Sequence, residues 1–232
     1  MNNHFIFRAF RAVDELETCV RFLEGHVKVL QDYGITNITT NNAVWMTNPA
    51  IYVIVAESPD GSEIYGGIRV HVADGRTPLP LEAAIGKMDK RVYDIINSYI
   101  DSGTGELCGL WNNKKVAGYG LSLLLIRAGI SIVTKINLNS LFTICADYTM
   151  PMVKRVGFTV EDSIGKNGDF VYPNENYIAK VLRKMNAISL DTAEEYDKNR
   201  ILDLRDNPVQ TFMELGPKGE MEIDYRLMIQ RK

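Results

Sequence analysis

Glu106-Leu-Cys-Gly-Leu-Trp-Asn-Asn-Lys-Lys-Val-Ala-Gly-Tyr-Gly-Leu-Ser122 is the stretch of this chain that decides its fold. In order, its residues predict a short buried strand, a polar turn, the two glycines Gly118 and Gly120, and an apolar helix over about 118–134. A glycine-rich turn from a strand into a helix leaves several backbone N–H groups unpaired, at the positive end of the helix dipole. The stretch therefore predicts a phosphate-binding site.

Two common nucleotide motifs do not fit this stretch. The dinucleotide fingerprint needs a third glycine, and the residue at that position is Leu123. The phosphate loop of nucleotide triphosphatases needs a lysine after its last glycine, and Gly120 is followed by Leu121. A simple turn, with no phosphate ligand, is the remaining alternative for the glycine pair.

Composition narrows the class of protein. A length of 232 residues fits one large domain, or one domain with an appendage. A net charge of −3 without a basic stripe argues against a nucleic-acid partner. The three cysteines have no metal-like spacing, so we expect no metal.

The longest apolar-rich segment, 121–133, is too short to span a membrane. The N-terminus lacks the features of a signal peptide, so we expect a cytoplasmic protein.

The rest of the chain predicts an alternation of strands and helices. Gly34 is expected to end the first helix in a left-handed conformation. Gly66-Gly67 lies inside one strand and predicts a bulge or a close backbone approach. We expect strands at 5–10, 50–57, 63–72, 106–112, 141–146, 158–161 and 177–182, helices at 13–30, 86–100, 118–134 and 150–155, a connector at 73–85, and finally a helix at 191–204 and a hairpin of 210–215 with 221–228. This order predicts an α/β (α+β) fold with a mixed, mostly antiparallel central sheet and helices on both faces.

The glycine motif resembles the coenzyme A site of the GCN5-related N-acetyltransferase (GNAT) superfamily. That motif is Arg/Gln-x-x-Gly-x-Gly/Ala, often with a glutamate twelve residues before the first glycine. Lys115 occupies the Arg/Gln position, Gly118 and Gly120 are the glycines, and Glu106 has the glutamate's offset. The order of elements also resembles the superfamily over about residues 5–184.

The resemblance implies an acyl-CoA N-acyltransferase type of fold in residues 1–184, with residues 185–232 as a C-terminal helix and hairpin extension packed on it. It implies acetyl-CoA or another acyl-CoA as co-substrate. Backbone N–H groups around 117–121 would bind the pyrophosphate, and the strand ending at 112 would bind the pantetheine arm. The expected coenzyme-binding residues are Leu110, Trp111, Asn112, Lys115, Ala117, Gly118, Tyr119, Gly120, Leu121 and Ser122.

Glu106 is the expected general base, because transfer of an acyl group to an amine needs the amine deprotonated. Burial at the start of a strand would raise the pKa of this carboxyl group. The alternative is a carboxylate that makes only a structural hydrogen bond.

Two positions depart from the superfamily pattern. Val153 stands where many members have a tyrosine that protonates the departing thiolate, and Ala146-Asp147 replaces a usual asparagine. Tyr148, close by in the sequence, is the substitute candidate for the acid. Otherwise water protonates the thiolate.

A finer resemblance is to the N-acyl amino acid and acyl-homoserine-lactone synthase branch of the superfamily. It rests on the stretch 66–72, on Leu-Pro-Leu-Glu at 79–82, and on Glu106-Leu-Cys-Gly-Leu, where the branch usually has Ser-Arg-Phe in place of Cys-Gly-Leu. The branch uses longer acyl chains, often on acyl carrier protein. Arg69 and His71 share one face of their strand, and point either to the acceptor site or to solvent.

These observations predict an N-acyltransferase that moves an acetyl or longer acyl group to a small-molecule amine, with acyl-CoA or acyl carrier protein as donor. The alternative is a catalytically inactive protein that keeps the fold and binds acyl-CoA or a partner. The C-terminal extension would cap the acceptor groove or form a homodimer contact.

Overall fold

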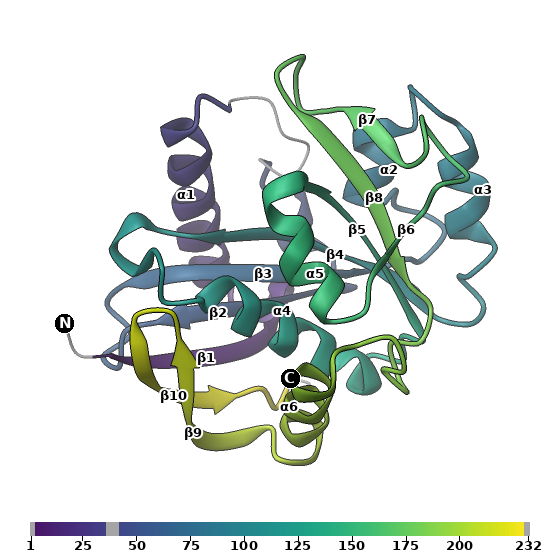
Figure 1. Cartoon of the computed structure of the whole chain (residues 1–232). Coiled ribbons are helices and arrows are strands. Elements are labelled where there is room, and N and C mark those ends of the chain that lie inside the picture. Colours follow the sequence, from purple (N-terminus) through teal and green to yellow (C-terminus); the bar gives the residue numbers. More distant parts are fainter. Residues whose placement is uncertain (1–2, 36–41, 230–232) are drawn as a thin grey trace.

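The computed structural model describes residues 3–35 and 42–229 (Figure 1). The strands are β1 (His4–Arg11), β2 (Ile51–Glu57), β3 (Ile64–Val72), β4 (Thr104–Asn112), β5 (Ser140–Ala146), β6 (Thr159–Val160), β7 (Asp169–Val171), β8 (Ile178–Lys184), β9 (Val209–Gly216) and β10 (Gly219–Arg226). The α-helices are α1 (Leu16–Asp32), α2 (Pro80–Ile85), α3 (Arg91–Asn97), α4 (Leu121–Ser131), α5 (Met150–Arg155) and α6 (Glu195–Asp206).

The strands form one continuous sheet in the order β6-β8-β5-β4-β3-β2-β1-β10-β9, with β7 beside β8. The β4–β5 and β1–β10 pairs are parallel, and the other pairs are antiparallel. The predicted mixed, mostly antiparallel sheet is confirmed.

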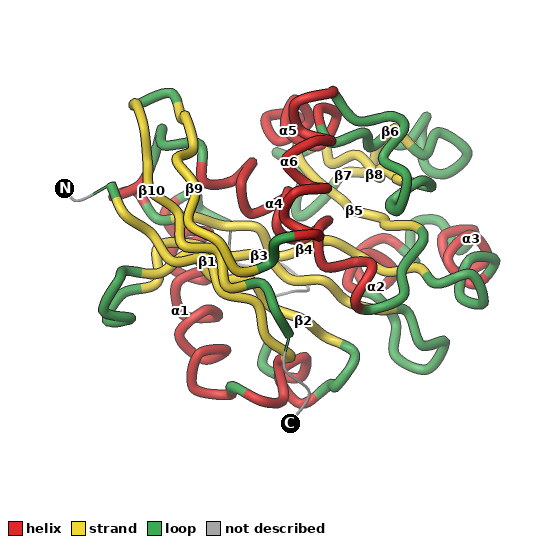
Figure 2. Tube along the Cα trace, turned by 90° about the horizontal axis from the view of Figure 1, so that it is seen from below, coloured by secondary structure: helices red, strands yellow, loops and turns green. Residues whose placement is uncertain are grey.

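Helices cover both faces of this sheet, as predicted. Figure 2 shows α1 on one side, with α4 and α6 on the other. The α1 side buries Phe22 and Cys19 against Val53 and Val55 of β2. Gly34 follows α1 with a φ of +70°, which is the left-handed end predicted for this helix.

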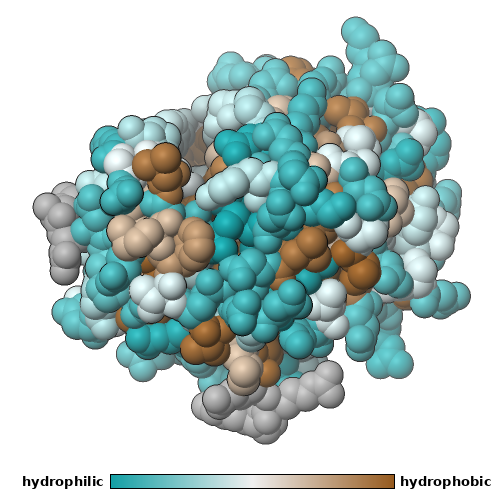
Figure 3. Space-filling model, turned by 60° about the horizontal axis from the view of Figure 1, so that its bottom comes forward, coloured by the Kyte–Doolittle hydropathy of each residue, from teal (hydrophilic) through white to brown (hydrophobic). Residues whose placement is uncertain are grey.

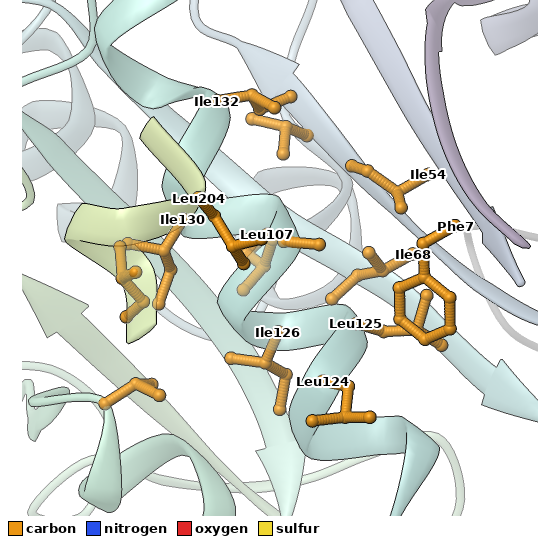
Figure 4. Close-up of a cluster of buried hydrophobic side chains, with 14 of the residues drawn as sticks. Phe7, Ile54, Ile68, Leu107, Leu124, Leu125, Ile126, Ile130, Ile132 and Leu204 are labelled. Atoms are coloured by element: carbon orange, nitrogen blue, oxygen red, sulfur yellow. The ribbon is translucent and has the colours of Figure 1, made fainter. Parts of the chain in front are cut away.

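Helix α4 is the centre of the larger core. Almost all of its residues are buried, and in Figure 4 Leu125 lies beside Phe7 of β1 and Ile68 of β3. The same cluster includes Ile54 of β2 and Leu107 of β4. A helix that is apolar around most of its circumference must be covered on most sides. Here the sheet covers one side, and α6 of the C-terminal extension contributes Ile201 and Leu204 on another.

Two expectations about the middle of the chain are wrong. Residues 80–85 form α2 instead of a connector, since a proline in the first turn of a helix gives up an N–H that has no intrahelical partner. The helix expected over 86–100 is the shorter α3, residues 91–97.

The C-terminal extension is built into the same sheet, because β10 pairs in parallel with β1. Buried ion pairs tie it to α4: Arg127 contacts Asp197 of α6 at 2.5 Å and Glu214 of β9 at 3.4 Å. Arg200 lies 3.0 Å from the same Glu214. The helix expected from residue 191 begins at residue 195.

The surface seen when the bottom of the molecule comes forward has small, separate groups of apolar side chains among hydrophilic ones (Figure 3). Among the described helices, none combines the length and the apolar character needed to cross a bilayer.

Candidate functional site

Strands β4 and β5 separate in the middle of the sheet. They pair only at residues 104–106 of β4, while β4 continues to Asn112 along β3 on its other edge. Gly109 has a φ of +60°, and the β3–β4 register shifts between Gly67 and Arg69, so β4 is bulged where the separation begins. The close backbone approach that was the other expectation for Gly66-Gly67 is present, because a Cβ at Gly66 would lie 2.6 Å from the carbonyl oxygen of Trp111. No described strand pairs with the β5-facing edge of residues 107–112, which leaves backbone groups of β4 available to an extended ligand.

The glycine loop lies at the far end of β4. Gly118 and Gly120 have φ values of +83° and +85°, a region that glycine enters without steric cost. Ala117 and Tyr119 donate their N–H groups to carbonyls within the loop. Leu121 and Ser122 open α4, so their N–H groups have no intrahelical acceptor. The amides of residues 118, 120, 121 and 122 thus have no recorded backbone acceptor in the described chain, and they lie at the positive end of α4, where an anion would be stabilised.

Several polar side chains around this loop already have hydrogen-bond or ion-pair partners within the protein. The Ser122 hydroxyl lies 2.5 Å from Oδ1 of Asn112, joining the start of α4 to the end of β4. Lys115, the basic residue of the motif, lies 2.7 Å from Glu63, and Lys114 lies 2.9 Å from Asp32. Lys114 and Lys115 are thus both paired with carboxylates.

A third lysine reaches the loop from the C-terminal extension. The turn between β9 and β10 packs on the loop so closely that a Cβ at Gly118 would lie 2.8 Å from the Lys218 side chain. Nζ of Lys218 is 5.3 Å from the centre of the Tyr119 ring. The structure records no ion pair of Lys218 within the described residues. Sequence reasoning missed this residue, because it lies outside the segment that resembles the superfamily.

Glu106 is completely buried where β4 and β5 separate. Its Oε2 accepts the N–H of Leu81 in the first turn of α2, at 2.7 Å. Burial raises the pKa of Glu106 to about 8, although the Leu81 hydrogen bond and the Arg69 charge act in the opposite direction. Its second oxygen, Oε1, has no hydrogen-bond partner in the described part of the chain.

Arg69 and His71 lie on the same face of the sheet as Glu106. His71 is the direct ladder partner of Glu106, and Arg69 that of Cys108. Both side chains are buried, with 0% and 8% exposed, so the solvent-facing alternative is wrong. The Arg69 guanidinium lies 4.2 Å from the ring centre of Trp45, a cation–π contact.

These residues belong to a group that we call the α1-face cluster: His26, Trp45, Arg69, His71, Glu106 and Trp111. Phe22 of α1 lies among them, with ring centres 5.8 Å from Trp45 and 5.7 Å from Trp111. Burial and the Arg69 charge lower the pKa of His26 to about 3 and hold the pKa of His71 well below its ordinary value. Both imidazoles are therefore neutral at physiological pH.

The structure does not bring Tyr148 to Glu106. Tyr148 lies in a 3₁₀ turn after β5, with 78% of its surface exposed, and makes no recorded contact with Glu106. Val153 is 3% exposed and packs in the core from α5. Among the described residues, no three His, Cys, Asp or Glu side chains gather as metal ligands.

Comparison with solved structures places this geometry in a known fold. FeeM, an N-acyl amino acid synthase from uncultured soil microbes, superimposes with a TM-score of 0.61 over 84% of this chain and 97% of its own, at 14% identity. The chain has the acyl-CoA N-acyltransferase (GNAT) fold.

Two further structures are similar at 12% identity and a TM-score of 0.52. BjaI, a CoA-dependent acyl-homoserine lactone synthase solved with SAM and isopentyl-CoA, covers 87% of this chain and 90% of its own. An acyl-CoA N-acyltransferase from Pseudomonas aeruginosa covers 78% of this chain and 99% of its own. The resemblance seen in the sequence is confirmed as a likeness of fold. The similar structures include an N-acyl amino acid synthase and an acyl-homoserine lactone synthase, the two kinds of enzyme named in the finer resemblance.

The amino-acid sequence itself matches no protein-family profile and no curated protein.

Proposed function

We propose that this protein is an N-acyltransferase that moves an acyl group from acyl-CoA to a small-molecule amine. One observation carries the proposal: β4 leaves β5 directly after the buried carboxylate Glu106 and runs to the glycine loop with an edge that no described strand pairs. The six residue-to-residue steps from Glu106 to Asn112 cover about 20 Å of strand. An acyl-CoA laid along this edge has its thioester near Glu106 and its pyrophosphate at the loop.

In this arrangement the backbone of Leu110, Trp111 and Asn112 hydrogen-bonds the pantetheine arm. The amides of residues 118, 120, 121 and 122 bind the pyrophosphate. The side chain of Trp111 packs in the α1-face cluster, so only its backbone belongs to the donor site. Lys115 is paired with Glu63, so its charge acts on the pyrophosphate from a distance and not through a direct contact.

The reaction is a direct displacement. The amine nitrogen attacks the thioester carbonyl carbon, a C–N bond forms, and the C–S bond breaks. Glu106, in its ionised form, takes the proton that the amine gives up, and the thiolate takes a proton from water, since Val153 has none to give. The buried charge of Arg69 disfavours a second cation close by, so it helps to keep the bound amine in its neutral, nucleophilic form.

A second candidate function is binding of acyl-CoA without turnover. It is favoured by the exposure of Tyr148 and the apolar packing of Val153, because neither position then holds an acid against the thiolate.

Thermal-shift measurements with CoA, acetyl-CoA and decanoyl-CoA, together with thiol release over a panel of amines, test both candidates. The panel contains L-leucine, phenethylamine and putrescine, and a parallel series replaces decanoyl-CoA with decanoyl acyl carrier protein. We expect stabilisation by at least one donor and amine-dependent thiol release. Stabilisation without thiol release would favour the second candidate, and no stabilisation by any donor would rule out both.

A further inference from the structure

Buried polar atoms without partners are concentrated on the α1 face of the sheet. Within the described residues, His26 Nδ1, Trp45 Nε1, His71 Nε2, Glu106 Oε1 and Trp111 Nε1 are all buried and lack a hydrogen bond. Native proteins satisfy the large majority of such atoms, because each one left unpaired costs free energy. A concentration of them beside a carboxylate marks a surface built to contact a polar ligand.

His71 and Glu106 form the centre of this group. They are directly opposite each other on antiparallel strands, so their side chains leave the sheet side by side, with Cβ atoms about 4.5–5.5 Å apart. Glu106 already uses Oε2 for the N–H of Leu81. When Glu106 is ionised, its Oε1 and the Nε2 of His71 are therefore two acceptors on neighbouring strands, and the structure records no hydrogen bond between them.

We propose that His71 is an acceptor-binding residue that holds the substrate's amino group jointly with Glu106. The amine donates one N–H to Glu106 Oε1 and a second N–H to His71 Nε2, with the imidazole proton on Nδ1. Two such bonds aim the nitrogen lone pair away from the α1 face and toward the opening between β4 and β5. The acceptor is accordingly a primary amine, because a secondary amine has only one N–H to give.

This inference rests on the proposed function, since it assigns a role at the acceptor side of the same site. It extends that function, because a general base needs only one N–H contact. The neutral state of the His71 imidazole is consistent with the role: a protonated ring would offer no lone pair.

The experiment compares His71→Leu with His71→Gln, using whichever of L-leucine, phenethylamine and putrescine supports the fastest thiol release. In His71→Leu we expect the KM for the amine to rise about tenfold, the KM for acyl-CoA to stay unchanged, and Tm to stay the same or rise. In His71→Gln we expect the amine KM to recover, because the amide oxygen replaces the Nε2 acceptor. The N-methyl derivative of the amine has only one N–H, so it should be a poor substrate of the natural protein, and His71→Leu should raise its KM little further.

His4→Gln is the matched control. The chain has three histidines, and His4 lies on β1, where Nε2 is 3.2 Å from Asp224. Both KM values should be unchanged in this variant.

Failure of the inference can be told apart from failure of the proposed function. If the natural protein releases thiol and His71→Leu keeps its amine KM, the inference is wrong, and a water satisfies the two atoms. If His71→Leu lowers Tm and raises both KM values together, His71 is only a structural residue. If no amine in the panel promotes thiol release, the proposed function fails and this inference fails with it.

Discussion

At the scale of single residues, Glu106 is fully buried and lies at the last position where β4 pairs with β5. Several groups act on its carboxyl group: the Leu81 N–H and Glu82 on α2, and Arg69, with His71 beside it, on β3. Desolvation outweighs the stabilising contacts, so the pKa of Glu106 rises to about 8. A base of this kind is mostly protonated at pH 7 and becomes competent as the pH rises.

The first prediction concerns the pH dependence of activity. In the natural protein, kcat/KM for amine-dependent thiol release should rise with pH through an inflection near pH 8, where half of Glu106 is ionised, and level off at higher pH. Glu106→Gln should lower kcat by 10²-fold or more and remove the inflection near pH 8. Steady-state rates from pH 6 to 10 measure both, and an identical profile in the variant would remove Glu106 from the mechanism.

The second prediction concerns stability, and its sign follows from the same raised pKa. Between the ordinary glutamate pKa of 4.5 and about 8, the folded protein holds a proton on Glu106 that the unfolded chain has lost. Stability therefore falls as pH rises through this window. Glu106→Gln should be close to the natural protein in free energy of unfolding at pH 5 and more stable by a few kcal/mol at pH 9. Urea unfolding at both pH values checks this, and a constant difference would contradict it.

At the scale of elements, the β9–β10 turn and the glycine loop form one unit. Besides the Lys218 contact at Gly118, a Cβ at Gly120 would lie 3.2 Å from Pro217, and one at Gly216 would lie 2.0 Å from the carbonyl of Tyr119. Gly118 and Gly120 thus meet two demands at once, a left-handed backbone and the close approach of a hairpin. The motif alone suggests only the first.

The third prediction concerns the contact of Lys218 with the glycine loop. Lys218→Gln should weaken CoA binding about fivefold, since an exposed lysine adds on the order of 1 kcal/mol to a phosphate contact, and should leave pantetheine binding unchanged. Lys87→Gln, an exposed lysine next to α2, is the control. Calorimetric titration with CoA and with pantetheine measures the two affinities. Equal losses of affinity for both ligands would show that Lys218 does not act on the phosphates.

At the scale of the whole molecule, buried charges join the C-terminal extension to α4. Asp197 is fully buried between Arg127 and Arg155, with its two oxygens 2.5 Å and 2.9 Å from their guanidinium nitrogens. Tyr225 of β10 adds a hydrogen bond to Glu214 at 2.8 Å. Since α4 also begins at the glycine loop, the extension fixes the helix whose N-terminus faces the proposed phosphate site.

The fourth prediction tests this connection. Asp197→Ala should lower the free energy of unfolding by about 3–5 kcal/mol, because it leaves much of the Arg127 charge buried without its partner. Asp162→Ala, an exposed carboxylate in the loop after β6, should change it by less than about 0.5 kcal/mol. Urea unfolding measures both, and a loss of less than 1 kcal/mol for Asp197→Ala would show that the ion pairs contribute little.

The sequence alone predicted the features that short-range rules govern. The alternation of apolar residues located most strands, Gly34 ended the first helix, and the glycine motif identified the GNAT fold, since periodicity and left-handed backbone are properties of neighbouring residues. Helix α2 was missed because a proline at a helix start and a proline in a connector look alike without their surroundings.

Only the tertiary structure decided which distant residues meet. The burial of Arg69 and His71, their place beside Glu106, the pairing of Lys115 with Glu63 and the arrival of Lys218 at the glycine loop all depend on strand order and on packing between segments far apart in the chain. The physical reason is that burial and the partners that set a pKa are properties of the assembled sheet: a strand pattern gives the face of a side chain, but not what covers that face.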